Sequence, residues 1–323
     1  MMHHFTAISA GPELPKLAGA RGRVLAVLGK AVYMRSDEGY IAGIAGPLAE
    51  DGPFTLRVAN IDLLVQLLKG REDTPFAGTS ALIELEDIAR LELGRARQWQ
   101  PRLPATMAGV AERIKAVRVL VGLLGGSWCD IGLCGLAAHL YGAQRSLPLP
   151  TEVPLLRTTS TVSYTVSRKL TRKVTEFQAA ATELEPQGAA NALVGLLGLG
   201  AGLTPSGDDV VAGILASLVW QARLGAVPPQ FAQQMVDAMR RAAPSRTNDI
   251  SVCLLWHAGH GLLYAPAMEL GEAMLRGYVV SIGSQVQRLL SIGHSSGADM
   301  AVGLLAGVVA GIEIESRSKV PSC

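Results

Sequence analysis

The chain has 323 residues and a formal net charge of +2, with 36 glycines and only 5% aromatic residues. This length allows two domains, or one large domain with a sizeable core. The net charge argues neither for nor against nucleic acid, but the lack of a basic stripe with interleaved aromatic residues predicts no nucleic-acid partner. The four cysteines fit no zinc-binding spacing.

The start of the chain and its apolar runs favour a reduced, cytoplasmic protein with no membrane partner. Residues 1–5 lack the basic-then-apolar layout of a secretory signal. The apolar runs that begin at Val210 and Met300 are each about a dozen residues long, which is too short to span a bilayer. The longer uncharged stretch 186–207 contains glycines and Pro205, which are incompatible with a lipid-exposed helix.

The first part of the chain predicts a β-rich domain over residues 15–103. Runs rich in strand-forming residues, separated by turn-like sequence, cover 23–34, 40–44, 54–58 and 82–93. A short helix is expected over 61–68. Trp99, Pro101 and Pro104 mark the end of this region.

From Pro104 onward the pattern becomes helical, which predicts a second domain over residues 104–312 and a loose tail over 313–323. Apolar residues at helical spacing run from Val110 to Leu124 and stop at Gly125. Further helices are expected over 132–141, 167–184, 228–243, 265–276 and 284–290, after Asp209, near Asn248 and over 299–312. The fold class is therefore α+β, with a glycine- and alanine-rich helical second domain.

Two stretches of the helical part are nearly the same. Residues 206–216 and 296–306 both read Ser-Gly-x-Asp-x-x-x-Gly-Ile/Leu-Leu-Ala, without a gap. Each copy predicts a turn that leads into a buried helix, and the free N–H groups and partial positive charge of a helix start attract anions. We therefore predict an internal repeat in which loops 202–209 and 293–299 face each other across a pseudo-twofold axis and bind a small anionic substrate.

The shared residues of the two copies have predicted roles in this site. The donors of N–H or hydroxyl hydrogen bonds to the substrate are expected to be Ser206, Gly207, Ser296 and Gly297, while Asp209 and Asp299 hold the loops. There is also a purely structural interpretation. A serine followed three residues later by an acid resembles a capping box, which would make both aspartates helix caps.

The residues that differ between the copies are expected to make asymmetric contacts. Asp208 is matched by Ala298, and Thr204 is matched by His294. Asp208 and His294 are the predicted catalytic residues, since histidine suits proton transfer near neutral pH. Thr204 and Ser295 are predicted to contact the substrate. The structural alternative for Asp208 is a favourable charge at a helix N-terminus.

A third polar cluster covers residues 244–251. Arg246 is a predicted clamp for a carboxylate or phosphate, because a guanidinium binds such groups bidentately; the alternative is a solvated arginine. Asn248 is expected to cap the next helix. The glycines over 198–202 match neither the dinucleotide fingerprint nor a Walker loop. We expect no cofactor and no metal, and a kinase-like enzyme with magnesium on Asp208 and Asp209 is kept as an alternative.

These motifs, in this order, resemble a bacterial family that long had only an unknown-function label. They lie at Gly198–Asp209, Thr247–Ser251 and Ile292–Asp299. The family is now associated with the third subunit of oxamate carbamoyltransferase in anaerobic allantoin breakdown, a part of purine degradation. The resemblance covers roughly residues 191–312 and brings no established catalytic residue with it.

The resemblance implies a cytoplasmic protein that works with two other subunits. The implied reaction exchanges a carbamoyl group between carbamoyl phosphate and oxamate, through oxaluric acid. Both substrates are anions, and the transition state places negative charge on the carbamoyl oxygen, which paired helix N-termini would stabilise. The competing interpretation is a non-catalytic scaffold or regulatory subunit whose loops bind only a partner protein. A homodimer is also left open.

Overall fold

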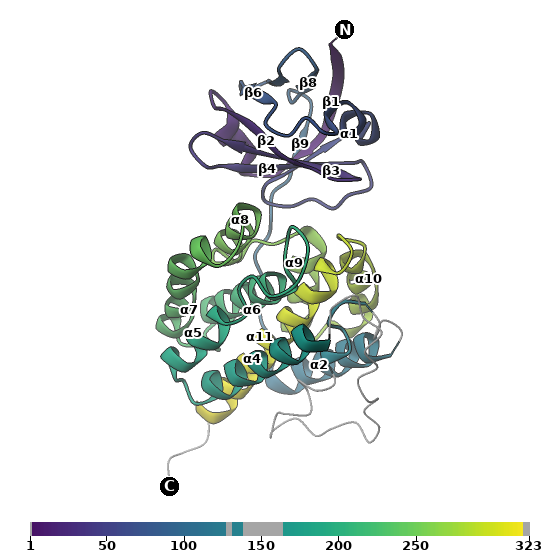
Figure 1. Cartoon of the computed structure of the whole chain (residues 1–323). Coiled ribbons are helices and arrows are strands. Elements are labelled where there is room, and N and C mark those ends of the chain that lie inside the picture. Colours follow the sequence, from purple (N-terminus) through teal and green to yellow (C-terminus); the bar gives the residue numbers. More distant parts are fainter. Residues whose placement is uncertain (1, 127–130, 138–163, 319–323) are drawn as a thin grey trace. The chain divides into compact units, whose positions relative to one another are not determined.

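The computed structural model describes residues 2–126, 131–137 and 164–318 (Figure 1). The chain divides into two compact units, Met1–Arg102 and Leu103–Cys323. The first unit is built from strands and the second from helices, so the predicted α+β class is confirmed.

The first unit contains one short α-helix, α1 (Ile61–Leu68), as predicted, and one 3-10 turn, η1 (Leu14–Leu17). Its described strands are β1 (His3–Ala10), β2 (Arg21–Val27), β3 (Ala31–Ser36), β4 (Ile41–Ala45), β5 (Thr55–Val58), β6 (Pro75–Gly78), β7 (Leu82–Leu85), β8 (Ala89–Glu92) and β9 (Arg97–Gln98). The run 23–34, expected as one β-rich segment, is a hairpin that turns at Leu28, whose N–H donates to the carbonyl of Ala31 at 2.8 Å.

The strands form one sheet that closes on itself. Its order is β5-β4-β3-β2-β6-β7-β8-β1-β9, and β1 also pairs with β5. From the sequence, the β-rich domain is expected to begin at residue 15, but the domain already begins with β1 at His3. Buried Phe5 and Ala7 alternate with exposed neighbours along β1, so this strand supplies the core as well as the closure.

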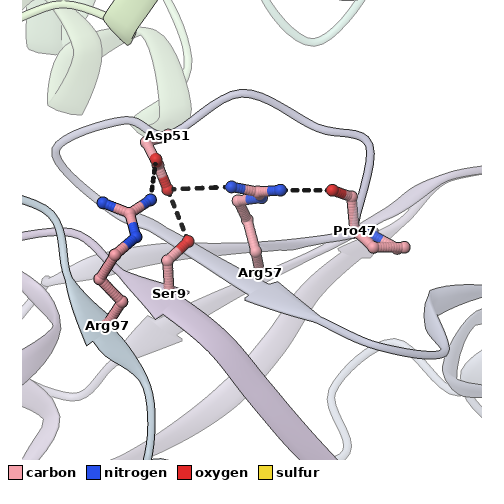
Figure 2. A network of polar contacts seen from close by, with 5 residues as sticks. All are labelled: Ser9, Pro47, Asp51, Arg57 and Arg97. Atoms are coloured by element: carbon pink, nitrogen blue, oxygen red, sulfur yellow. Dashed lines mark hydrogen bonds and ion pairs between the residues drawn. The ribbon is translucent and has the colours of Figure 1, made fainter.

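A polar cluster fastens the loop before β5 to its neighbours (Figure 2). Asp51 accepts hydrogen bonds from the Ser9 hydroxyl and the Arg97 guanidinium, each at 2.5 Å, and it pairs with Arg57 at 3.5 Å. Arg57 also donates to the carbonyl of Pro47. Burial alone would raise the pKa of Asp51, but the Ser9 hydroxyl and the two arginines lower it below its ordinary value. The cluster is a structural fastening of the β-rich unit.

The helical unit begins with α2 (Val110–Gly125), which ends where the sequence predicted. The other described helices are α4 (Tyr164–Thr182), α5 (Pro186–Val194), α6 (Ser206–Arg223), α7 (Pro229–Ala242), η2 (Ala243–Ser245), α8 (Asp249–Ala258), α9 (Ala265–Arg276), α10 (Val279–Leu290) and α11 (Ser296–Ser318). α5 was not predicted. The described part of the expected helix 132–141, residues 132–137, is mostly turn, and residues 138–141 lie outside the described ranges.

α6 and α11 form the interior of this unit (Figure 1). α6 packs against α7 and α8, while α11 packs against α2, α4, α9 and α10. α11 is long and apolar enough to cross a membrane by length and composition, but its apolar window is 100% buried inside the unit, as in a core helix. It also continues to Ser318, so residues 313–318 are helical and do not belong to a loose tail. Residues 319–323 lie outside the described part.

Candidate functional site

α6 and α11 pack backbone against backbone near their first turns. A Cβ atom added at Gly213 would lie 2.5 Å from the carbonyl oxygen of Met300, and one added at Gly303 would lie 2.1 Å from that of Val210. The two contacts are reciprocal, because Gly213 and Gly303 are equivalent positions of the two similar stretches, and so are Val210 and Met300. Only glycine permits this approach.

The same reciprocity continues along the helices. The Ser217 hydroxyl donates to the carbonyl of Leu304 at 3.2 Å, and a Cβ atom at Gly307 would lie 3.0 Å from the carbonyl of Ile214. One turn later, the Gln221 amide donates to the carbonyl of Gly307 at 2.8 Å. Because later residues of α6 contact later residues of α11, the two helices run parallel and in register. Their N-termini therefore lie beside each other.

The loops that precede the two helices turn at glycines. Gly200 (φ 121°) lies against Ser206, and Gly293 (φ 62°) lies against Ser296. These backbone conformations strongly favour glycine. Six positions separate Gly200 from Ser206, whereas three separate Gly293 from Ser296, so the first loop is three residues longer. Thr204, which the gap-free comparison matches with His294, lies in this longer turn of the first loop.

The two loops meet through side chains. The hydroxyl oxygens of Thr204 and Ser296 are 2.7 Å apart, and either one can donate the hydrogen bond. Burial raises the pKa of Asp209 and of Asp299; the Ser296 hydroxyl opposes the rise at Asp209, and the Ser206 hydroxyl opposes it at Asp299. The serine–aspartate interactions are therefore crossed between the two helices.

The predicted capping box of the first copy is wrong. The N-cap of α6 is Pro205, and Ser206 is already the first helical residue. Proline has no N–H group that Asp209 could bond in return, and no side chain caps this end. The crossed arrangement explains why an acid stands at Asp209: it faces the other helix.

Asp209 and Asp299 are buried: Asp209 is 1% exposed and Asp299 is 0% exposed. The Oδ2 atom of each lacks a hydrogen-bond partner among the described residues. The other oxygen of Asp299 accepts a hydrogen bond from the backbone N–H of Leu133 at 2.8 Å. Leu133 follows Gly132 (φ 50°), where a Cβ atom would lie 2.5 Å from the same Asp299 oxygen.

Both carboxyls of this pair resist ionisation. Burial raises the pKa of Asp209 well above 3.8, and the charge of Asp299 raises it further. Burial likewise raises the pKa of Asp299 to about 6, against the opposing effects of the Ser206 hydroxyl and the Leu133 N–H. Two neighbouring carboxyls that disfavour double ionisation titrate as a unit and hold a proton to higher pH than a solvated pair.

Asp208, a predicted catalytic residue, has a structural position. It is 0% exposed. Its Oδ1 atom accepts a hydrogen bond from the N–H of Gly198 at 2.8 Å, and its Oδ2 atom accepts one from the hydroxyl of Thr247. Burial raises the pKa of Asp208, while these bonds and the Ser251 hydroxyl oppose the rise. Both oxygens are occupied, so Asp208 ties the glycine loop to the start of α8, and the geometry does not support its catalytic assignment.

The N–H groups of the two glycines among the predicted donors, Gly207 and Gly297, are also occupied. The N–H of Gly207 donates to the carbonyl of Leu199 at 2.8 Å, and that of Gly297 donates to Ile292 at 3.1 Å. A Cβ atom at Gly207 would lie 2.0 Å from the carbonyl of Leu196. These glycines let each helix start pack against the segment before it, so the prediction that their N–H groups bind an anion is wrong for this conformation.

The remaining predicted site residues are Arg246, His294 and Ser295. Arg246 and His294 are exposed, and their side chains have no hydrogen bond or ion pair with the described residues. Ser295 is half-buried, and its hydroxyl opposes the rise in the pKa of Asp299 that burial causes. A Cβ atom added at Gly198 would lie 2.3 Å from the carbonyl oxygen of Arg246, so the backbone at Arg246 packs closely on the first loop.

Asn248 caps α8 as predicted and adds a second attachment to the same loop. Its Oδ1 atom accepts from the N–H groups of Ile250 and Ser251 at 3.0 and 3.1 Å. Its amide donates to the carbonyl of Leu203 at 2.8 Å. Sequence reasoning missed Leu133 and the role of Thr247. A backbone N–H leaves no sequence signal, whereas Thr247 belongs to a motif that the sequence singled out.

The chemistry available here is that of hydroxyls, a carboxyl pair, a guanidinium and an imidazole. Within the described residues, no group of three or more histidines, cysteines, aspartates or glutamates is arranged to hold a metal ion. The structure brings together Thr204, Ser206, Asp209, Ser295, Ser296 and Asp299. Arg246 and His294 are exposed residues of the neighbouring segments.

Comparison with known proteins agrees with the motif resemblance. The model of the family described as oxamate carbamoyltransferase subunit AllH matches residues 196–308. No curated protein and no solved structure matches the chain. The matched segment contains both loops and the α6–α11 crossing. Over residues 196–308, the chain is similar to the family of the oxamate carbamoyltransferase subunit AllH.

Proposed function

We propose that this chain is a subunit of an oxamate carbamoyltransferase, and that the joined loops before α6 and α11 bind one of its small anionic substrates. The observation that carries the proposal is the span of the family match, residues 196–308, which includes the Thr204–Ser296 contact. In the complex, the chain works in the cytoplasm on carbamoyl exchange between carbamoyl phosphate and oxamate, as a step of allantoin catabolism.

The anion is held by side chains in this proposal, because the glycine N–H groups are occupied. Arg246 supplies a guanidinium that matches a carboxylate or phosphate bidentately. His294 supplies an imidazole, and Thr204, Ser295 and Ser296 supply hydroxyls. Carbamoyl phosphate and oxamate both carry negative charge, so the exposed guanidinium serves either of them.

The test is reconstitution. The chain is co-expressed with candidate partner subunits of an oxamate carbamoyltransferase, and carbamoyl transfer is measured on the purified complex with carbamoyl phosphate and oxamate. Each charge-assisted hydrogen bond to the anion is worth about 1.5–3 kcal/mol. Arg246→Ala is therefore expected to raise KM by roughly 10- to 100-fold. Arg241→Ala, which removes another exposed arginine, is the matched control and leaves KM unchanged.

A wild-type complex that assembles but transfers no carbamoyl group would overturn the enzymatic proposal. The alternative is a scaffold or regulatory subunit. It is favoured by Asp208 and the Gly207 N–H, which are hydrogen-bonded within the chain and so do not face a substrate. In that alternative, Arg246→Ala and His294→Ala weaken co-purification with the partner subunits and leave the KM of any assembled complex unchanged.

A further inference from the structure

The carboxyl pair between α6 and α11 has a connection to the surface that helix packing does not require. Asp209 is 1% exposed, and its Oδ2 atom lacks a hydrogen-bond partner among the described residues. The Thr204 and Ser296 hydroxyls both interact with the Asp209 carboxyl and oppose the rise in its pKa that burial causes. Unlike the carboxyl, both of these residues are half-buried, so their hydroxyls lie between the buried acid and the exposed side of the loops.

We propose that the Thr204–Ser296 hydroxyl pair, with Asp209 behind it, is the proton path of carbamoyl transfer, and that Asp299 positions and tunes Asp209. This inference rests on the proposed function. The hydroxyl pair contacts the reacting nitrogen of the substrate, and the proton passes along the 2.7 Å hydrogen bond toward Asp209. Neither carboxyl touches the substrate: Asp209 receives the proton through the hydroxyls, and Asp299 is a positioning residue for Asp209.

The step balances in atoms and electrons. The amide nitrogen of oxamate forms a bond to the carbamoyl carbon, and the bond from that carbon to the phosphate oxygen breaks with its electron pair leaving on phosphate. The proton lost by the nitrogen goes to the hydroxyl pair, which passes its own proton to Asp209. In the reverse direction, phosphate attacks the carbamoyl carbon and Asp209 returns the proton to the leaving nitrogen.

The electrostatics suit this exchange. An amide nitrogen is a weak nucleophile, and a proton acceptor is most effective when its pKa lies near the working pH. Burial and the charges of Asp299, in α11, and Asp208, in α6, raise the pKa of Asp209 well above its ordinary value. A solvated aspartate would be ionised but too weak a base, whereas this buried pair is a stronger one.

The buried position also answers the simpler explanation that Asp209 only holds the helices together. A structural carboxylate is expected to have both oxygens bonded, as Asp208 does. Asp209 and Asp299 each keep one buried oxygen without a partner among the described residues. A buried charged oxygen without a partner is costly, and protonation of the carboxyl reduces this cost by removing the charge.

The experiment uses the full complex and records kcat against pH. Thr204→Val keeps the shape of the side chain and removes the hydroxyl, so kcat is expected to fall by about 100-fold or more, the usual contribution of proton transfer. Thr204→Ser restores the hydroxyl and most of the rate. Asp299→Asn removes the neighbouring charge, so the acid limb of the kcat profile moves to lower pH while activity remains.

Asp209→Asn completes the set, because it removes the proton acceptor. The acid limb is expected to disappear together with most of kcat. A Thr204→Val complex with a wild-type kcat, or an Asp299→Asn complex with an unmoved acid limb, would overturn the proton path even if Asp209→Asn fails to fold. A wild-type complex without transfer activity would instead overturn the proposed function, so the two failures are distinguishable.

Discussion

Replacing Gly303 by alanine tests the close crossing of α6 and α11. The new Cβ atom would lie 2.1 Å from the carbonyl oxygen of Val210 and within 3.0 Å of two further backbone atoms of that residue. Since Cβ atoms essentially never approach other atoms closer than 3.0 Å, the helices must separate by about 1 Å at this point. Backbone atoms cannot turn away as a side chain can.

The magnitude follows from two opposing effects. Overpacking of a core costs about 1–3 kcal/mol and occasionally more. Alanine in place of glycine inside a helix returns up to about 1 kcal/mol. With backbone on both sides, we expect Gly303→Ala to lower the free energy of unfolding by about 2 kcal/mol. Urea denaturation followed by circular dichroism at the helical wavelength measures this change.

Gly283→Ala in α10 is the matched control. Nothing lies within 4 Å of the Cβ position of Gly283, so only the gain in helix propensity remains and the variant is expected to be neutral or slightly stabilised. Equal stabilities for the Gly303→Ala and Gly283→Ala proteins would refute the close packing of α6 on α11.

Three further predictions concern other parts of the helical unit. Arg113 is 0% exposed and pairs with Glu315, so Arg113→Met is expected to cost about 3 kcal/mol of unfolding free energy, and adding Glu315→Gln recovers part of it in the same urea assay. Asp208→Asn weakens two hydrogen bonds to a carboxylate and is expected to lower the melting temperature, with a loss of about 2 kcal/mol; an unchanged melting temperature would contradict its structural role. Asp299 has a folded-state pKa of about 6 against an ordinary 3.8, so the folded protein binds more protons and loses stability as pH rises through this window, by up to ~3 kcal/mol. Asp299→Asn is expected to remove that loss, and parallel urea midpoints for variant and wild type from pH 4 to 8 would disprove it.

Local patterns predicted the two parts of the chain and most of the helices. The Val110–Leu124 spacing gave α2, and the Asn248 motif gave the cap of α8, because both depend on neighbours within a few residues. β1 has the expected alternation of buried and exposed residues, but its pairing with β5 and β8 connects distant segments, which a sequence pattern does not show.

The site divides in the same way. The two similar stretches indicated helix starts that face each other, and the structure places Thr204 against Ser296. The roles of single residues depended on distant partners. Asp208 is bonded by Thr247, 39 residues away, and a capping box cannot form at Pro205. What Asp209 faces is decided by α11, which no local pattern around Asp209 contains.

A double-mutant cycle on Thr204 and Ser296 tests most directly whether the two loops make one site. The rate of carbamoyl transfer is measured for reconstituted complexes that carry Thr204→Val, Ser296→Ala or both. Because the two hydroxyls share one hydrogen bond and one proton path, the double variant is predicted to lose no more rate than the worse single variant. Losses that multiply, as for independent residues, would contradict the account.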